Sequence, residues 1–380
     1  MKLVKLGNMI FVLSGLVSLL VAETLPNKTE IEKFLAKQLE VGDTTVKTFI
    51  LDSVKGINIP MLMPVLKKLT TDENVAVRMR SAYLLAKCYS NLSYNNVLVD
   101  IVKTKPVVQN PESPVGRAKL LLKNNIRAEA LKLLADIGEE KSFSVVSEAT
   151  KDSEGIVVDA AYFSLAILSK KYKKTELVSD LMEFFYSGLK HTDPKVRTKA
   201  VKILGELKEV GAVQPLTLRL KDYDKTVRAT TLISLGEIGD VSALQDMSYL
   251  KSDKEDSVRA ALAKSLGVMA ESIKRSTDNV KVDGLNRIRN LLIDLLNDIN
   301  GEVRVEAAVS LLKISDRSGM FIIEKGLKSE DKDVIIYCIS SIGNYGRRED
   351  INLIKDFLNT DDVLMQIATR ISLWKIYSRE

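Results

Sequence analysis

The chain of 380 residues repeats one pattern at a spacing of 31 positions. Two adjacent copies within residues 191–240 match most closely. Their paired positions are Asp193 and Asp224, Val196 and Val227, Arg197 and Arg228, Ala200 and Thr231, Leu204 and Leu235, and Gly205 and Gly236. A fixed period of this length predicts a solenoid, in which each unit packs on its neighbours and no central globular core is needed.

The same pattern extends over most of the chain, as ten aliphatic anchor positions show. These anchors are Val46, Val77, Ile126, Val157, Val196, Val227, Val258, Val303, Val334 and Val363. Five of the nine gaps between them are 31 residues long, and an aliphatic residue follows every anchor by eight positions. Small residues often follow by four or nine positions, and such spacings place all these side chains on one helix face.

Helix boundaries are marked independently of the apolar pattern. Residues that favour helix N-caps precede seven anchors by three positions, and they are Asp43, Asn74, Asp193, Asp224, Asn300, Asp331 and Thr360. A shorter apolar segment, such as 212–220 or 351–358, lies between successive copies and predicts the first helix of each pair. No segment alternates as a strand does, so the sequence predicts an all-α fold.

The segment from Asp193 to Gly205 resembles the HEAT repeats, and in particular the short HEAT-like units first described in phycobilisome lyases. It carries their pattern Asp-x-x-Val-Arg-x-x-Ala-x-x-x-Leu-Gly. The resemblance covers about 340 residues and implies a right-handed α-solenoid, a superhelix of about ten antiparallel helix pairs. It also implies that the second helices line the concave side, and it implies no activity.

Three segments lengthen the period: residues 103–116, 170–174 and 272–284. The first contains Pro106, Pro111 and Pro114, which interrupt regular helix and predict a projecting loop. The second contains four lysines around Tyr172, which would suit acidic lipid headgroups or an acidic partner. Insertions in repeat proteins often contact partners, and the alternative interpretation is a solvated loop.

The N-terminus predicts a secretory signal peptide over residues 1–22. Lys2 and Lys5 precede an uncharged, mostly apolar stretch that ends at Ala22 and is shorter than a membrane-spanning helix. Cleavage would leave residues 23–380 as a single solenoid. The alternative is an uncleaved anchor, because Leu20 stands where a small residue is preferred before the cleavage site.

An arginine follows many of the anchors, which predicts a ladder of guanidinium groups along the solenoid. Its members are Arg78, Arg127, Arg197, Arg228, Arg259 and Arg304. One interpretation is a track for phosphate or carboxylate groups. The favoured interpretation is structural, with each arginine paired to an acidic residue such as Asp193, Asp224, Glu255 or Glu302.

The sequence contains no recognisable catalytic, cofactor-binding or metal-binding motif. His191 is the one histidine and is expected in an exposed turn, while Cys88 and Cys338 lie too far apart along the solenoid for a disulfide. Neither zinc-ligand spacings nor nucleotide-binding glycine motifs occur. We therefore expect no catalytic residues, no cofactor and no metal.

Composition and charge narrow the function further. The 56 basic and 50 acidic residues give a net charge of +6, which is too balanced for a nucleic-acid footprint. Together with the leader, this favours an exported, non-enzymatic scaffold that binds a protein partner in the periplasm or envelope of a bacterium. It would contact the membrane only if the leader is uncleaved. The alternatives are a HEAT-like enzyme of lyase or glycosylase type and, without export, a nucleic-acid-binding protein.

The repeat register makes one direct prediction about stability. Leu204→Ala is expected to lower the free energy of unfolding by roughly 2–5 kcal/mol, because the register places this side chain in the core. Thermal melting measures the effect, and a melting curve that the substitution leaves unchanged would refute the register.

Overall fold

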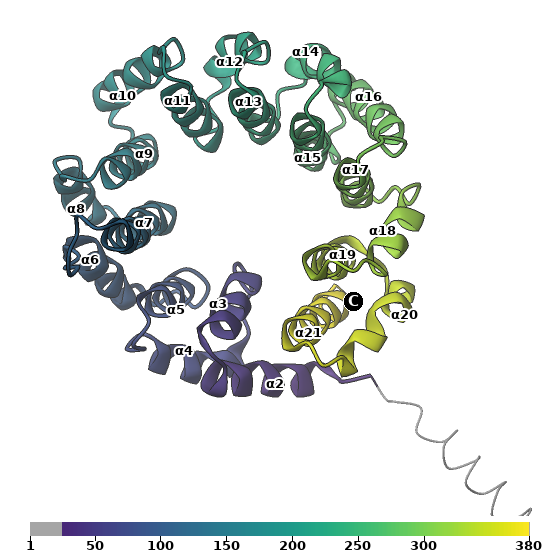
Figure 1. Ribbon diagram of the computed structural model, residues 1–380, viewed down its shortest axis with the longest axis horizontal. Helices are drawn as coiled ribbons and strands as arrows, with labels where there is room; N and C mark the ends of the chain where they lie inside the picture. The colour runs from purple at the N-terminus through teal and green to yellow at the C-terminus, as the bar shows by residue number, and fades with distance from the viewer. Residues whose placement is uncertain (1–24, 380) are drawn as a thin grey trace, which may run out of the picture.

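The computed structural model describes residues 25–379, so the predicted signal peptide at 1–22 lies outside the described residues. Within this range every regular element is an α-helix or a short 3₁₀ helix, and none is a strand. The helices form two concentric layers, one outer and one inner (Figure 1). The predicted all-α solenoid is confirmed.

Outer and inner helices alternate along the chain, and several outer helices include short 3₁₀ segments. The outer helices are α2 (Lys28–Val41), α4 (Met63–Leu69), α6 (Asn95–Lys103), α8 (Ser142–Ala149), α10 (Thr175–Gly188), α12 (Val213–Arg219), α14 (Leu244–Ser248), α16 (Asn279–Leu295), α18 (Met320–Gly326) and α20 (Ile351–Ile354). The inner helices are α3 (Thr44–Ser53), α5 (Val75–Lys87), α7 (Pro114–Ile137), α9 (Gly155–Lys171), α11 (Pro194–Glu206), α13 (Lys225–Ile238), α15 (Asp256–Ile273), α17 (Gly301–Lys313), α19 (Lys332–Tyr345) and α21 (Val363–Tyr377).

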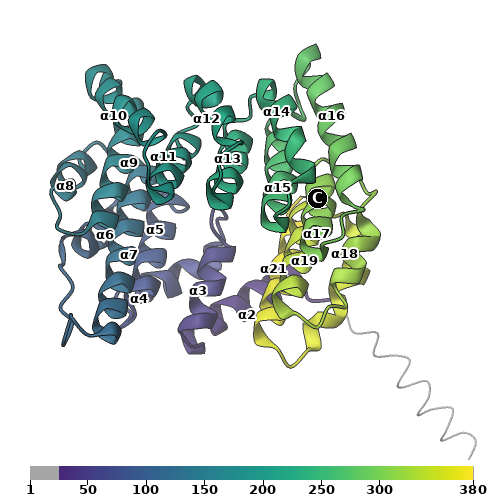
Figure 2. The same cartoon turned by 45° about the horizontal axis from the view of Figure 1, so that its top comes forward.

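The two ends of the solenoid meet, so the described chain forms a ring (Figures 1 and 2). At the seam, the indole Nε1 of Trp374 in α21 donates a hydrogen bond of 2.9 Å to Glu32 Oε1 in α2. The guanidinium of Arg370 lies 4.0 Å from the centroid of the Phe34 ring. The rotation between successive repeats therefore adds up to closure of the solenoid.

The predicted helix starts are largely confirmed by side-chain hydrogen bonds to backbone N–H groups. Such caps are Asp43, Asn74, Asp193, Asp224, Asn300 and Asp331. The last prediction, Thr360, is wrong, because Asp362 caps α21 instead. The last anchor is accordingly the buried Met365 rather than Val363, and it lies 31 residues after Val334.

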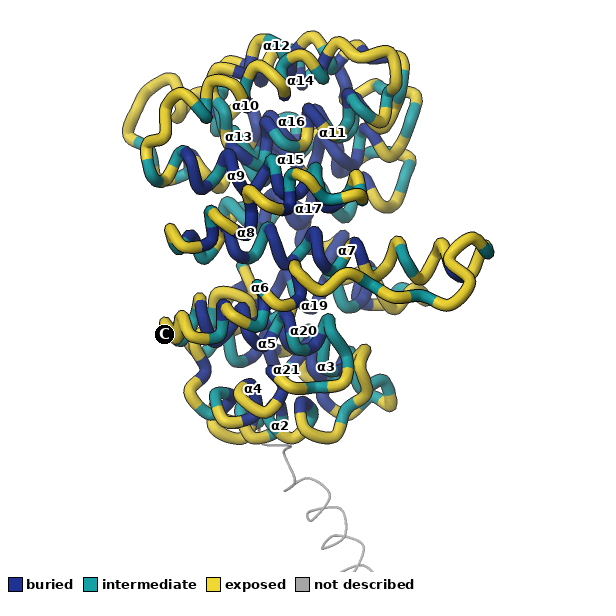
Figure 3. Tube along the Cα trace, turned by 90° about the vertical axis from the view of Figure 1, so that its left-hand side faces the viewer, coloured by how far each residue is buried: buried dark blue, intermediate teal, exposed yellow. Residues whose placement is uncertain are grey.

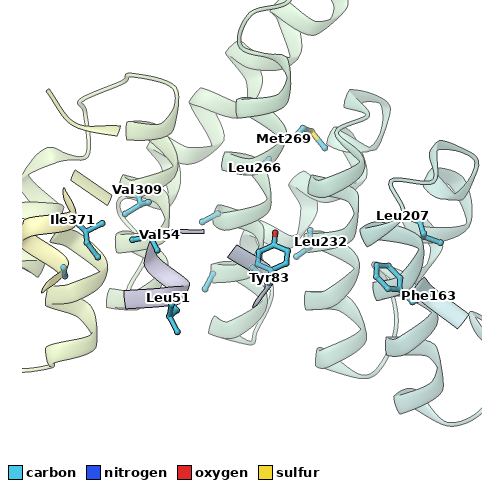
Figure 4. Packing of buried hydrophobic residues seen from close by; sticks show 14 of the residues in the cluster. Leu51, Val54, Tyr83, Phe163, Leu207, Leu232, Leu266, Met269, Val309 and Ile371 are labelled. Atoms are coloured by element: carbon cyan, nitrogen blue, oxygen red, sulfur yellow. The ribbon is translucent and has the colours of Figure 1, made fainter. Parts of the chain in front are cut away.

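The apolar face of the inner helices is buried as predicted. All ten residues eight positions after the predicted anchors are buried, and Leu204 is fully inaccessible. Figure 4 shows side chains from many repeats, including Leu232 and Leu266, and these belong to one hydrophobic cluster. The core is therefore continuous from repeat to repeat.

Glycine and serine let neighbouring inner helices approach closely. A Cβ added to Gly236 in α13 would lie 2.7 Å from the carbonyl oxygen of Ser265 in α15, which leaves no room for a larger residue. Three serines donate hydrogen bonds to carbonyl oxygens of the preceding inner helix. These bonds are Ser234 to Val201 (3.0 Å), Ser310 to Ala263 (2.9 Å) and Ser372 to Ile339 (3.0 Å).

The arginine ladder joins one repeat to the next through paired hydrogen bonds to aspartates. Nε and Nη2 of Arg197 donate to the two carboxylate oxygens of Asp222, each at 2.8 Å. The same arrangement joins Arg228 to Asp253 and Arg259 to Asp298, and Arg127 donates to Asp152 through both terminal nitrogens. The ladder is therefore structural at these positions.

The acidic partners expected from the sequence are the wrong ones. Asp193 and Asp224 cap their own helices, and neither Glu255 nor Glu302 bonds to a ladder arginine. The actual partners lie five residues before the next anchor, in the turn that follows the next outer helix. From that turn, a carboxylate reaches the arginine of the preceding repeat and also caps backbone N–H groups, as Asp222 does for Asp224.

Acid should weaken these bridges. Burial acts to raise the pKa of Asp222, but hydrogen bonds from Arg197 and from the backbone N–H of Asp224 outweigh it and lower the pKa. A carboxyl group with a lowered folded-state pKa stabilises the fold above its unfolded pKa of about 3.9, and this contribution is lost as pH falls through the folded-state pKa. The bridge is therefore expected to persist at neutral pH and to fail in strong acid.

Asp222→Asn is expected to destabilise the protein by roughly 3–5 kcal/mol at pH 7, because Arg197 would stay buried without a counter-charge. The loss should shrink as the pH falls through the lowered folded-state pKa, because the carboxyl group is then protonated in both states. Urea denaturation over a series of pH values from 7 downwards measures both effects. Glu255→Gln, which removes an exposed pair with Lys225, is the control and should change stability by less than about 1 kcal/mol. Equal effects of the two substitutions would contradict a structural ladder.

Candidate functional site

Two ladder arginines have no carboxylate partner among the described residues. Nη1 of Arg78 donates to the carbonyl oxygens of Asp72 (2.6 Å) and Glu73 (3.1 Å). Nη1 of Arg304 makes the equivalent bonds to Asp298 (2.7 Å) and Ile299 (2.9 Å). In both side chains Nε and Nη2, the atoms that hold the aspartate at Arg197, Arg228 and Arg259, make no hydrogen bond within residues 25–379.

The missing carboxylates follow from the residue that occupies their place. Asp152, Asp222 and Asp298 each stand third after the end of an outer helix. The third residue after α6, opposite Arg78, is Pro106, and the third after α18, opposite Arg304, is Ser329. The residues at these turns differ visibly in the sequence, but acidic residues nearer to each arginine suggested other partners.

Arg78 lines a pocket of about 510 Å³ between α5, α6, α7 and the turn after α6. Its aliphatic lining consists of Val75, Val97, Ile101, Pro106, Val107 and Ile126. The charged lining consists of Arg78, Lys105, Lys123, Arg127 and Asp100. Because Asp152 neutralises Arg127, the pocket keeps three basic groups against one acidic group.

Arg304 lines a larger pocket, of about 850 Å³, with a different electrostatic character. Its acidic lining residues are Glu302, Glu306, Asp331 and Asp333, and its basic ones are Arg304, Lys325 and Lys328. Four acidic groups against three basic groups do not favour an anion. The Arg78 pocket is thus the better anion site of the two.

The 103–116 insertion projects from the ring, as predicted. Residues 104–113 form the connection between α6 and α7, and α7 begins at Pro114 and extends beyond its neighbours (Figure 3). We call residues 104–123 the spur. Lys123 Nζ donates to the carbonyl oxygen of Val107 at 2.9 Å and so ties the two arms of the spur together.

The spur exposes apolar and basic side chains together. Its apolar members are Val107, Val115, Leu121 and Leu122, each more than half exposed. Its exposed charged members are Lys105, Arg117, Lys119, Lys123 and Glu112, a net charge of +3 from four basic residues and one acidic residue. The Arg78 pocket lies at the base of the spur and shares Lys105, Pro106, Val107 and Lys123 with it.

The 170–174 insertion comprises the last two residues of α9 and the turn after it, and three of its four lysines contact the chain itself. Lys170 pairs with Glu209 at 2.5 Å, and Lys171 donates to the carbonyl oxygen of Gly138 at 2.6 Å. The ammonium of Lys174 lies 3.7 Å from the centroid of the Phe143 ring. These contacts favour a structural role for the cluster.

The 272–284 insertion is mostly helical, which corrects the expected loop. Helix α15 continues to Ile273, and α16 begins at Asn279, so that only residues 274–278 connect them. Asp278 accepts hydrogen bonds from the N–H groups of Val280 and Lys281, and this cap starts α16 earlier than the polar sequence suggests.

The single histidine lies in an exposed turn, as expected. His191 takes the place in the turn that an aspartate fills elsewhere in the ladder, and its Nδ1 accepts a hydrogen bond from the N–H of Asp193 at 3.0 Å. The corresponding position in the preceding inner helix is Val158, which has no charge to pair. At this joint the ladder therefore lacks both its arginine and its aspartate.

Residues 25–379 contain two free thiols and no cluster of metal-binding side chains. No group of three or more His, Cys, Asp or Glu side chains in this range is placed to hold a metal ion. Cys88 and Cys338 are free thiols, and burial raises the pKa of Cys338 to about 11, so this thiol is protonated at neutral pH. No helix in the described range is long and apolar enough to span a membrane.

The inner helices carry their own ion pairs from one repeat to another. Arg80 in α5 donates from Nε to both carboxylate oxygens of Asp52 in α3 at 3.0 Å, and its Nη2 lies 3.6 Å from Glu129 in α7. Lys132 in α7 reaches Glu206 in α11 at 3.0 Å. The accessible face of the inner layer is therefore mixed in charge.

One comparison with known proteins identifies the type of repeat in part of the chain. The family model of HEAT repeats matches residues 182–267, which contain the two clearest copies of the pattern. No curated protein sequence matches the chain. Among solved structures, the complex of CpcE and CpcF of phycocyanin lyase from Nostoc sp. PCC7120 is similar, with 16% identity and a TM-score of 0.41 over 62% of this chain and 94% of that one.

Two further structures illustrate the range of similar proteins. Human deoxyhypusine hydroxylase is 16% identical, with a TM-score of 0.33, over 76% of this chain and 96% of its own. A designed armadillo repeat protein is also 16% identical, with a TM-score of 0.32, over 51% of this chain and 99% of its own. The matched family model thus shows HEAT repeats at residues 182–267, and the same pattern recurs along the rest of the described chain.

Proposed function

We propose that the chain is an exported, non-enzymatic scaffold that binds another protein in the bacterial cell envelope. The observation that carries this proposal is the spur, where Val107, Val115, Leu121 and Leu122 stand in solvent beside a basic pocket. Grouped exposed apolar residues with a polar rim are typical of protein-binding surfaces. The spur also falls at a break in the repeat period, where repeat proteins often contact partners.

Charge supports a protein partner with acidic and apolar groups. The spur has a net charge of +3, and its basic residues alternate along the sequence with its exposed apolar residues. Aspartates neutralise four of the ladder arginines, so the ladder does not form a continuous track for phosphates. Complementary charge of this kind accelerates association and selects among partners.

Export is supported by the sequence of residues 1–22, with its basic start and apolar stretch. Cell fractionation combined with N-terminal sequencing tests it. The mature protein is expected in the envelope fraction, with a new N-terminus near residue 23. A chain that keeps Met1 and stays in the cytoplasm would contradict export and would favour a HEAT-like enzyme or a nucleic-acid-binding protein.

Docking through the spur is tested by affinity capture from envelope extracts with cross-linking and mass spectrometry. Wild-type protein is expected to cross-link to a partner through Lys119 or Lys123, which flank the apolar pair Leu121 and Leu122. The double variant Leu121→Lys and Leu122→Lys should lose this partner, because charge would replace the apolar contact.

Leu218→Lys is the matched control, since Leu218 is an equally exposed leucine (66%) on the outer helix α12. This variant should keep the partner. Cross-links confined to the ring itself in wild-type protein, or equal recovery with all three proteins, would contradict docking through the spur.

A further inference from the structure

In the Arg78 pocket, the ladder arginine lacks, within residues 25–379, the aspartate partner that other ladder arginines have. In four other repeats an aspartate carboxylate occupies the corresponding position and bonds to the ladder arginine through paired hydrogen bonds. At Arg78 the same arginine is present, held by the same carbonyl contacts as Arg197 and Arg228, but Pro106 replaces the carboxylate. The guanidinium is therefore already oriented for a planar anion with two oxygens.

The rest of the pocket is suited to an aliphatic group next to that anion. Six aliphatic side chains line it, and Lys105 and Lys123 add positive charge at its edge. One acidic side chain, Asp100, is present against these two lysines and Arg78. A ligand that carries a carboxylate and an aliphatic group close together would satisfy both kinds of lining.

We propose that this pocket binds the carboxyl terminus of a partner polypeptide that ends in an aliphatic residue. The terminal residue holds a carboxylate and a side chain on one Cα, so both fit within one pocket. An internal Asp or Glu in an extended segment is a poorer fit, because neighbouring side chains point to opposite sides. The inference rests on the proposed scaffold function and names the chemistry that the partner presents beside the spur.

The carboxylate of the terminal residue accepts hydrogen bonds from Nε and Nη2 of Arg78, and its side chain lies against Val97, Ile101 and Ile126. Backbone upstream of the terminus leaves the pocket along the spur, where Leu121 and Leu122 are exposed. Two contacts from one partner are thus made side by side, in the Arg78 pocket and on the spur above it.

The test uses full-length mature protein and isothermal titration with three acetylated peptides. The first peptide ends in Val-Leu with a free C-terminal carboxylate. The second has the same sequence with a C-terminal amide. The third also has a C-terminal amide but carries an Asp residue at an internal position. The free-acid peptide is expected to bind, and the amide and internal-Asp peptides are expected to bind at least about tenfold more weakly. Equal affinities for the acid and the amide, or preference for internal Asp, would overturn the assignment.

Substitutions then locate the site. Arg78→Gln should weaken binding of the free-acid peptide by about tenfold or more. Arg304→Gln is the matched control, because it removes the same backbone contacts from the other unpaired ladder arginine, and it should leave binding unchanged. Loss of affinity in both variants, or in neither, would overturn the assignment.

Pro106→Asp gives an independent readout that does not depend on a weakened fold. It supplies an internal carboxylate at the vacant ladder position, so it should raise the melting temperature and abolish peptide binding. Peptide binding unaffected by this substitution would overturn the assignment. If peptides fail to bind while the Leu121 and Leu122 variant still loses its envelope partner, the pocket assignment fails and the scaffold function stands.

Discussion

The contact between neighbouring inner helices sets the form of the whole molecule. A glycine on one inner helix lies against a serine of the next. An arginine at the start of one inner helix forms hydrogen bonds with an aspartate in the turn before the next inner helix. Both features occur together at the joints between α11 and α13, α13 and α15, and α15 and α17, where they hold successive helices close together. A rotation repeated at each joint brings the last inner helix back to the first two helices, where Trp374 bonds to Glu32. Closure is thus a consequence of the joints, and the seam adds contacts that no single repeat specifies.

Side chains become accessible to a ligand where the repeat pattern is interrupted. A ladder arginine with an aspartate has its hydrogen bonds satisfied within the protein, and burial of both charges closes the site to ligands. At Arg78 the longer connection between α6 and α7 substitutes Pro106 for the aspartate and, at the same time, pushes the spur into solvent. One insertion therefore creates both an anion site and an apolar surface beside it. The lysine cluster at 170–174 shows the opposite outcome, since its charges are used within the chain.

Local features were predictable from the sequence and long-range ones were not. The caps at Asp193 and Asp224 and the buried Leu204 follow from helix period and local hydrogen bonding, which a single repeat contains. The partner of Arg197 lies 25 residues away in the next turn, so proximity in sequence suggested the wrong acids. Val363 was predicted as the last anchor in place of Met365 because both residues are apolar and they lie only two positions apart. Ring closure depends on small angles summed over all joints, and the bond between Trp374 and Glu32 spans 342 residues.

These joints bring the two ends of the solenoid together, and a distance measurement across the seam tests this closure most directly. Thr29 in α2 and Ile351 in α20 line one pocket at the seam, so spin labels at Thr29→Cys and Asn352→Cys would sit on opposite sides of it. Cys88 and Cys338 are first replaced by serine and alanine. Pulsed electron paramagnetic resonance is expected to show one short, narrow distance distribution in solution, which broadens when Trp374 and Arg370 are both replaced by alanine. A long or broad distribution in the otherwise unaltered chain would contradict a closed ring.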